Sequence, residues 1–327
     1  MIAVSTNTVP FDENQLTDVL VIDRLVAVDA DEFIAEDIPE REALMTGPTD
    51  PLLYKQSINQ LFAHRGTGKT LLALAMAKAL ATGSEFLKWK CDKAHRVMYI
   101  EGELPQKQLQ TRIKTVVGQT SGFLKVVTLD KQVKNLIPSL HTVEGQDLVD
   151  SLIRAHQSEV LILDSISTLT SFGTNDEENW LSFLRWLMTL RSRGLCIIFL
   201  HHAGKSGMQR GHSRSEDQLD VSIKLSRPTD YRVSEGLRCV LDFDKVREEC
   251  KDADSLEIQL MTNKGEAQWL YTENEDAQKR KVLALLSEGM SERDVADMTK
   301  VPKTTVHRWK LQTKAMLEDE PANELPF

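Results

Sequence analysis

The chain has 327 residues, of which 41% are hydrophobic, and 40 Lys+Arg against 49 Asp+Glu give it a formal net charge of −9. This apolar content is enough for a sizeable core and more than one domain, and it excludes a disordered or fibrous chain. The sequence has no apolar run long enough to span a bilayer and no basic stretch followed by an apolar core near its start. We therefore expect a cytoplasmic protein without a membrane span.

Charge is unevenly distributed and divides the chain into four predicted segments. Residues 1–50 are strongly acidic, residues 51–275 are nearly neutral, residues 276–315 are basic, and residues 316–327 are acidic and end in Phe. Segregated charge of this kind reflects local partners rather than overall solubility. The acidic arm is expected either to dock on the body as short helices or to stay mobile.

The body predicts an α/β fold with a mostly parallel sheet and an antiparallel extension. Apolar runs alternate with helical patterns, and parallel strands need such crossovers. The expected strands are residues 58–63, 96–100, 124–129, 160–163 and 195–200, and the expected helices are residues 70–81, 105–117, 145–157 and 177–193. Three further strands without long helices between them, which predict the antiparallel part, are residues 221–225, 237–246 and 256–260.

A phosphate-binding loop (P-loop) is the strongest signal. Residues 63–70 follow an apolar strand, open an Ala-rich helix and match GxxxxGK[ST] at every position except the first, Ala63. Glycines suit a backbone that wraps around phosphates, the lysine counters phosphate charge, and the threonine hydroxyl is a Mg²⁺ ligand. The loop residues expected to bind the nucleotide are Ala63, His64, Arg65, Gly66, Thr67, Gly68, Lys69 and Thr70.

Three further strand ends carry candidate catalytic groups. Asp164 follows an apolar strand and is expected to share the Mg²⁺ site with Thr70. Glu101 and Glu103 follow another strand, and either carboxylate is able to orient the attacking water; we favour Glu103, although strand periodicity does not choose between them. His201 and His202 end the next strand, where an imidazole would sense the γ-phosphate through a hydrogen bond, unless both are structural.

These motifs, with residues 199–205 and Arg210-Gly211-His212-Ser213, resemble those of the RecA-type ATPases. The likeness spans about residues 40–270 and is strongest to the hexameric plasmid replication helicases of the RepA type, AAA-type ATPases of mobile elements. It implies a RecA-like P-loop NTPase fold, ATP with Mg²⁺, and a homo-oligomeric ring. It also implies that Glu103 activates water and that His201 or His202 is the phosphate sensor.

The same resemblance implies that a basic side chain from the adjacent subunit neutralises charge in the transition state. Similar placement past the next strand points to Lys224 and Arg227, with Arg210 as a third candidate. A finger of this type is worth about 10³–10⁵ in rate, so activity would depend on protein concentration. The polar stretch between residues 203 and 219 holds Lys205 and Arg214, which in a ring would contact a single-stranded DNA backbone; the alternative is an ordinary surface loop.

The basic segment predicts three helices, over residues 277–286, 291–298 and 302–312. From Gly289 to Trp309 it resembles the helix-turn-helix of site-specific recombinases and many regulators, in which the last helix lies in the major groove. The residues that this resemblance turns toward duplex DNA are Lys303, Thr304, Thr305 and Arg308. The alternative is a small helical interaction bundle.

The tip Glu324-Leu325-Pro326-Phe327 is similar to the acidic tip of bacterial single-stranded-DNA-binding proteins, which docks on replication and repair enzymes. The alternative is a solubilising tail.

The whole chain therefore predicts a Mg²⁺-dependent ATPase acting on DNA, a ring-forming replicative helicase or helicase-like motor of a plasmid, phage or other mobile element. An ATP-switched DNA-binding regulator and a partition or recombination-type ATPase without unwinding activity are the alternatives.

Overall fold

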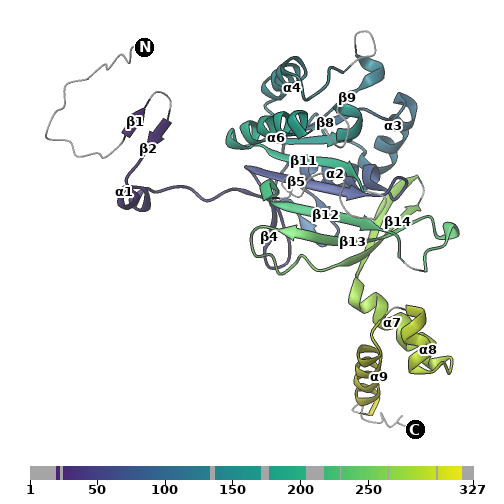
Figure 1. Cartoon of the computed structure of the whole chain (residues 1–327). Helices are drawn as coiled ribbons and strands as arrows, with labels where there is room; N and C mark the ends of the chain where they lie inside the picture. Colours follow the sequence, from purple (N-terminus) through teal and green to yellow (C-terminus); the bar gives the residue numbers. More distant parts are fainter. Residues whose placement is uncertain are drawn as a thin grey trace, which may run out of the picture. The chain divides into compact units, whose positions relative to one another are not determined.

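The chain divides into two compact units, Met1–Arg41 and Glu42–Phe327, in the computed structural model (Figure 1). The residues that the structure describes are 20–22, 25–132, 137–170, 177–203, 217–228, 230–263, 265–299 and 301–318. Within the first unit, β1 (Leu20–Ile22) and β2 (Leu25–Ala27) form an antiparallel pair, and α1 (Ala30–Ala35) follows. The side chain of Asp29 caps α1 by accepting from the amide of Asp31.

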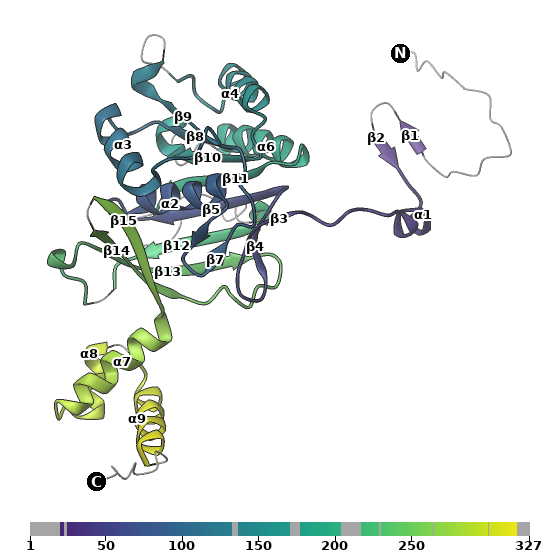
Figure 2. The same ribbon diagram turned by 180° about the vertical axis from the view of Figure 1, so that it is seen from behind.

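A nine-stranded sheet forms the centre of the second unit (Figures 1 and 2). Its order is β15-β14-β13-β12-β5-β11-β10-β8-β9, and neighbours are parallel from β12 to β9 and antiparallel from β12 to β15. The strands are β5 (Ser57–Ala63), β8 (Val97–Glu101), β9 (Leu124–Thr128), β10 (Val160–Asp164), β11 (Cys196–His202), β12 (Val221–Ser226), β13 (Leu237–Val246), β14 (Leu256–Asn263) and β15 (Glu266–Glu273). The predicted α/β fold, with its parallel sheet and antiparallel extension, is confirmed.

Two details of the extension differ from the prediction. β12 pairs parallel to β5, so the antiparallel part begins at β13 rather than at β12. β15 was not among the predicted strands, because it lies at the sheet edge and mixes polar with apolar residues along its length.

A second, four-stranded sheet also belongs to this unit. Its order is β4-β3-β7-β6, with strands β3 (Ala43–Thr46), β4 (Pro51–Tyr54), β6 (Glu85–Phe86) and β7 (Trp89–Lys90). β3 lies inside the predicted acidic arm of residues 1–50, but Leu44 and Met45 are 2% and 0% exposed. Burial of this apolar pair places residues 42–50 with the body rather than with the arm.

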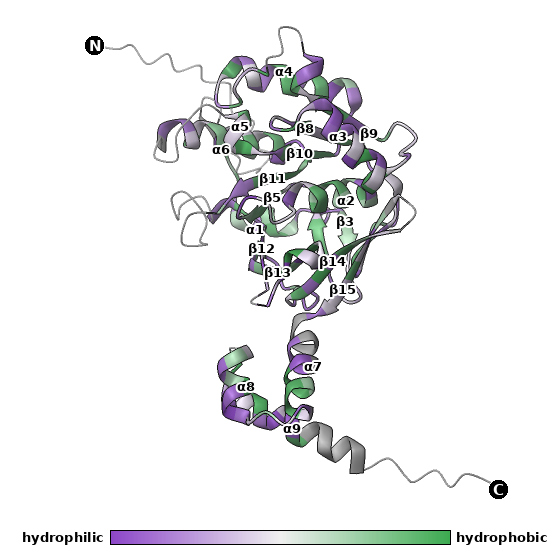
Figure 3. Ribbon diagram, turned by 90° about the vertical axis from the view of Figure 1, so that its right-hand side faces the viewer, coloured by the Kyte–Doolittle hydropathy of each residue, from purple (hydrophilic) through white to green (hydrophobic). Residues whose placement is uncertain are grey.

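Helices cover both faces of the large sheet. They are α2 (Lys69–Thr82), α3 (Gln106–Arg112) with the π-helical turn η1 (Ile113–Val117), α4 (Val143–His156), α5 (Ile166–Leu169) and α6 (Glu177–Ser192); short 3-10 turns are η2 (Leu129–Lys131) and η5 (Val233–Glu235). Alternate strand residues face opposite layers: in β10, Ile162 packs in the cluster that contains α2, whereas Leu163 packs with α4, α5 and α6. Figure 3 shows hydrophobic residues gathered on the inner strands and on α2.

Three helices follow β15: α7 (Asn274–Ser287), α8 (Glu292–Thr299) and α9 (Lys303–Glu318). They share a small core of their own, formed by Val282, Val295, Val301, Val306 and Trp309. We call α7–α9 the C-terminal module. Across the described residues, no helix is both long and apolar enough to cross a membrane.

Candidate active site

The P-loop (residues 63–70) joins the carboxyl end of β5 to the start of α2. Gly66 and Gly68 have φ of 75° and 110°, which residues with a Cβ rarely adopt. At Gly68 a Cβ would also collide with the side chain of Leu237. The loop keeps this shape because both positions are glycine, and successive amides next to a helix N-terminus form a concave surface that suits phosphate.

Lys69 is held at the mouth of the loop. Its Nζ donates to the carbonyl oxygens of Ala63 at 3.1 Å and His64 at 3.3 Å, and lies 3.3 Å from Nδ1 of His202. The hydroxyl of Thr67 also donates to the His64 carbonyl, at 2.8 Å. Burial lowers the pKa of Lys69, and the negative charge of nearby Asp164 opposes this shift. The ammonium is bound by weak neutral acceptors, which phosphate oxygens would replace with a stronger interaction.

Thr70 and Asp164 form the oxygen pair expected for Mg²⁺. Asp164 ends β10 and is 3% exposed, and its Oδ2 accepts from the hydroxyl of Tyr99 at 2.7 Å. The side chain of Thr70 also hydrogen-bonds to this carboxylate. Burial raises the pKa of Asp164, and the two hydrogen bonds oppose that rise. An alcohol and a buried carboxylate fit Mg²⁺, which prefers oxygen ligands.

The two glutamates after β8 occupy different environments. Glu101 is 1% exposed, and its Oε1 accepts from the backbone amides of Glu103 at 2.9 Å and Leu104 at 2.6 Å. Its Oε2 has no hydrogen-bond partner among the described residues, and burial raises its pKa to about 7. The side chain of Glu103 is 50% exposed, and its Oε2 lies 3.9 Å from Nε2 of His202. Glu101 therefore shapes the turn, while Glu103 reaches open space beside the histidine.

Strand alternation separates the two histidines of β11. His202 lines the same cavity as Lys69 and Glu103. His201 lies against α6, where its ring stacks with that of Trp180 at a centroid distance of 6.2 Å. Of these two histidines, His202 is therefore the one that faces the cavity.

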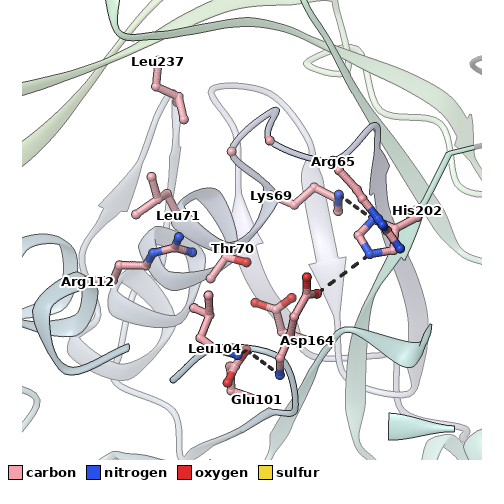
Figure 4. Close-up of a pocket in the computed structure, with 13 residues that line it drawn as sticks. Arg65, Lys69, Thr70, Leu71, Glu101, Leu104, Arg112, Asp164, His202 and Leu237 are labelled. Atoms are coloured by element: carbon pink, nitrogen blue, oxygen red, sulfur yellow. Dashed lines mark hydrogen bonds and ion pairs between the residues drawn. The ribbon is translucent and has the colours of Figure 1, made fainter. Parts of the chain in front are cut away.

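A cavity of about 250 Å³ joins these groups (Figure 4). Figure 4 shows Arg65 beside Lys69 and His202, with Arg112 and Leu71 across the loop from them. The sequence predicted Arg65 as a loop residue but missed Arg112 and Leu237. Arg112 was a basic residue on the helix that begins at the site, which is a usable signal, whereas Leu237 comes from the start of β13 and nothing local in the sequence marks it. The described residues that line the cavity are Arg65, Gly66, Gly68, Lys69, Thr70, Leu71, Glu101, Glu103, Leu104, Arg112, Asp164, His202 and Leu237.

Two of the three predicted finger residues lie within the described residues, in different surroundings. Lys224 is half-buried on β12, where it pairs in register with Asp242 of β13. Arg227 contacts the P-loop of its own chain, donating to the Gly66 carbonyl at 2.8 Å. The third candidate, Arg210, lies outside the described residues, as do Lys205, Arg214 and the tip Glu324-Leu325-Pro326-Phe327.

The predicted duplex-contacting residues lie on α9. Lys303, Thr304 and Arg308 are exposed and Thr305 is half-buried, whereas Val306 and Trp309 are inside the module. One face of α9 is thus polar and accessible, and the opposite face holds the module together.

A second group with potential metal ligands lies away from the cavity. Glu42, His95 and Glu159 bring their ligand atoms within 4.8 Å of one another. Lys55 lies 2.8 Å from Glu42 and 2.9 Å from Glu159, and Lys93 lies 2.6 Å from Glu42. The two ammonium groups already neutralise the carboxylates, so this cluster is an ion-pair network rather than a metal centre.

Comparison with known proteins agrees with this geometry. A family model described as an AAA domain matches residues 20–208, more than half of the chain. Among solved structures, a KaiC-like protein from the hyperthermophilic archaeon Pyrococcus horikoshii OT3 is 16% identical, with a TM-score of 0.53. The match covers 71% of this chain and 99% of that chain, and at this identity it shows a shared fold. The predicted RecA-like P-loop fold is confirmed.

Proposed function

The chain belongs to the AAA domain family, and we propose that it is a Mg²⁺-dependent ATPase that acts on DNA as a ring-forming helicase or helicase-like motor of a plasmid, phage or other mobile element. The observation that carries the ATPase part is the convergence of Lys69, Thr70, Asp164, Glu103 and His202 on one cavity. These are the charge-neutralising, metal-binding, water-orienting and sensing groups that phosphoryl transfer needs.

Each group has a proposed step in hydrolysis. The P-loop amides and Lys69 would hold the β- and γ-phosphates, and Thr70 and Asp164 would hold Mg²⁺, which would supply positive charge to offset the negative charge of the phosphates. Glu103 orients a water and accepts its proton as the water oxygen attacks the γ-phosphorus, and the bond to the β-phosphate oxygen breaks to give ADP and phosphate. His202, between Lys69 and Glu103, is proposed to donate to a γ-phosphate oxygen through Nε2.

The DNA part of the proposal has separate support. The basic segment that forms the C-terminal module exposes Lys303, Thr304 and Arg308 on α9, which suits a phosphate backbone or a major groove. The resemblance to hexameric RepA-type helicases supports a ring in which a neighbour supplies the catalytic cation and in which Lys205 and Arg214 contact single-stranded DNA. Of the three predicted cations, Arg227 already donates to the Gly66 carbonyl of its own chain, which favours Lys224 or Arg210 for that role. The tip ending in Phe327 is proposed to recruit replication or repair enzymes.

The test is ATP turnover with and without single-stranded DNA, together with a strand-displacement assay. We expect DNA to stimulate the wild-type protein, and Glu103→Gln to bind ATP but turn it over about 10² times more slowly. If single-stranded DNA does not change the rate of ATP turnover and the protein displaces no strand, the proposed motor function is contradicted.

The second candidate function is an ATP-switched DNA-binding regulator, which is favoured by the accessible polar face of α9. In that case ATP controls assembly while the C-terminal module reads one duplex sequence. The distinguishing result would be tight binding to a single duplex sequence with little turnover.

A further inference from the structure

The segment that follows β12 is tied to the P-loop through Arg227. Its guanidinium donates to the Gly66 carbonyl at 2.8 Å and to the Arg238 carbonyl at 3.0 Å. The same group lies over the ring of Tyr231, 4.0 Å from the centroid. Arg227 thus bridges the P-loop and the first residues of β13 within one chain.

The Gly66 carbonyl is one of two consecutive P-loop carbonyls held from this side. The next, that of Thr67, accepts from Sγ of Cys239 at 3.5 Å. In a trans peptide the C=O of one residue and the N–H of the next point in opposite directions. With both carbonyls turned toward Arg227 and Cys239, the amides of Thr67 and Gly68 point away from these two groups.

The partner of Arg227 is itself fixed. Arg238 donates to Glu257 at 2.7 Å, to Glu235 at 3.0 Å and to Asp230 at 3.3 Å. Three carboxylates on one guanidinium hold the backbone of Arg238 in place, so the acceptor that anchors Arg227 has little freedom. The ring of Tyr231 is held in turn by its hydroxyl, which donates to the Gly236 carbonyl at 2.8 Å.

We propose that Arg227 is a positioning residue that acts in cis: by holding the Gly66 carbonyl outward it presets the Thr67 and Gly68 amides to receive nucleotide phosphates. This inference rests on the proposed nucleotide-binding function of the same loop. It gives Arg227 a different role from a cation supplied in trans, because it predicts an effect on binding of any nucleotide with a β-phosphate rather than on hydrolysis alone.

The test compares Arg227→Ala with Arg232→Ala, which removes an exposed arginine from the same segment. Dissociation constants for fluorescent ADP and ATP analogues are measured on dilute protein, with KM and kcat alongside. Loss of a charged hydrogen bond that preorganises the loop is expected to weaken binding of both nucleotides by about 10- to 100-fold in Arg227→Ala. Arg232→Ala is expected to match the wild type, and an Arg227→Ala protein with wild-type ADP affinity overturns the proposal.

Two controls separate positioning from other roles. Arg227→Lys keeps the charge but lacks the two-pronged donor, so it is expected to bind with intermediate affinity; this variant serves if Arg227→Ala does not fold, as judged by thermal unfolding. Mixing Arg227→Ala with Lys69→Ala protein tests action in trans. Restored turnover would show that Arg227 acts on a neighbour and would overturn the proposal, whereas a wild-type protein that binds neither nucleotide would overturn the proposed function itself.

Discussion

Nζ of Lys69 lies 3.3 Å from Nδ1 of His202. An ammonium group only donates, so Nδ1 is the acceptor and a neutral ring carries its proton on Nε2. That proton faces Glu103, whose Oε2 is 3.9 Å away. The imidazole therefore links Lys69, which we propose binds phosphate, to Glu103, which we propose orients water, and a γ-phosphate bound there would be in reach of both.

Replacing His202 by Ala is expected to lower kcat about 10²-fold, because a donor to the transition state is lost while the P-loop remains. The affinity for ADP should change little, since ADP lacks the γ-phosphate. His201→Ala is the matched control: it removes a buried ring that packs on Trp180, so its main effect should be a lower melting temperature with a nearly normal kcat. Equal kinetic losses in the two variants would contradict the assignment.

The two glutamates should separate by kinetics. Glu103→Gln keeps the shape of the side chain but accepts no proton, so kcat should fall about 10²-fold or more with ATP affinity retained. Glu101→Gln keeps the oxygen that accepts from the Glu103 and Leu104 amides, so its kcat should fall less. Single-turnover hydrolysis with pre-bound ATP measures this difference directly. A larger loss in Glu101→Gln would make Glu101 the base.

Glu101 also predicts a pH dependence of stability in the absence of nucleotide and metal. Burial raises its pKa from 4.5 to about 7 in the folded protein, so the folded state holds the proton more tightly than the unfolded chain. Its contribution to the free energy of unfolding is then fully present below about pH 4.5 and is lost as pH rises to about 7.

Glu101→Gln, which has no proton to lose, should remove this part of the pH dependence and unfold at a higher temperature than the wild type near pH 8. Thermal unfolding from pH 5 to pH 8 checks it. If the melting temperatures of the two proteins change with pH in parallel, the carboxyl group is already ionised at the lower pH.

Much of the sheet could be read from the sequence, because strands buried on both faces are continuous apolar runs and their helices carry clear start signals. Val160–Asp164 and Cys196–His202 are of this type. The small sheet was missed because its strands are two to four residues long, as in Glu85–Phe86, and too short to show a period. β15 was missed because an edge strand is less covered by its neighbours, so its sequence does not form a continuous apolar run.

The candidate site likewise contains residues that the sequence predicts and residues that it does not. The P-loop and the groups that end β8, β10 and β11 are local motifs, so the sequence placed them together. The sequence could not choose between neighbours such as His201 and His202, because side-chain direction depends on the strand's register within the sheet. Arg227 and Leu237 could not be connected to Gly66 and Gly68, because those contacts depend on the path of a chain more than 150 residues later.

Gly68 is expected to tolerate no side chain, for two reasons that can be separated. Gly68→Ala meets both a φ of 110° and the side chain of Leu237. Adding Leu237→Ala removes the collision with the Leu237 side chain but leaves the unfavourable φ, which costs about 1–2 kcal/mol. The double variant should therefore bind nucleotide better than Gly68→Ala but about tenfold or more below the wild type. Nucleotide titrations of the three variants provide the measurement, and full recovery in the double variant would show that the collision alone matters.

The polar face of α9 gives a prediction for DNA binding. Arg308→Ala should weaken binding to duplex DNA, and the slope of log affinity against log salt should become shallower by about 0.9 for each DNA phosphate that the variant no longer neutralises. Lys310→Ala is the matched control, because it removes the same charge from the same helix at a residue that the helix-turn-helix resemblance does not turn toward DNA. Trp309→Ala, which removes a side chain that is 3% exposed, should instead unfold the C-terminal module. Fluorescence anisotropy at several salt concentrations distinguishes these outcomes, and an Arg308→Ala protein with the affinity and salt slope of Lys310→Ala would show that this face of α9 does not bind DNA.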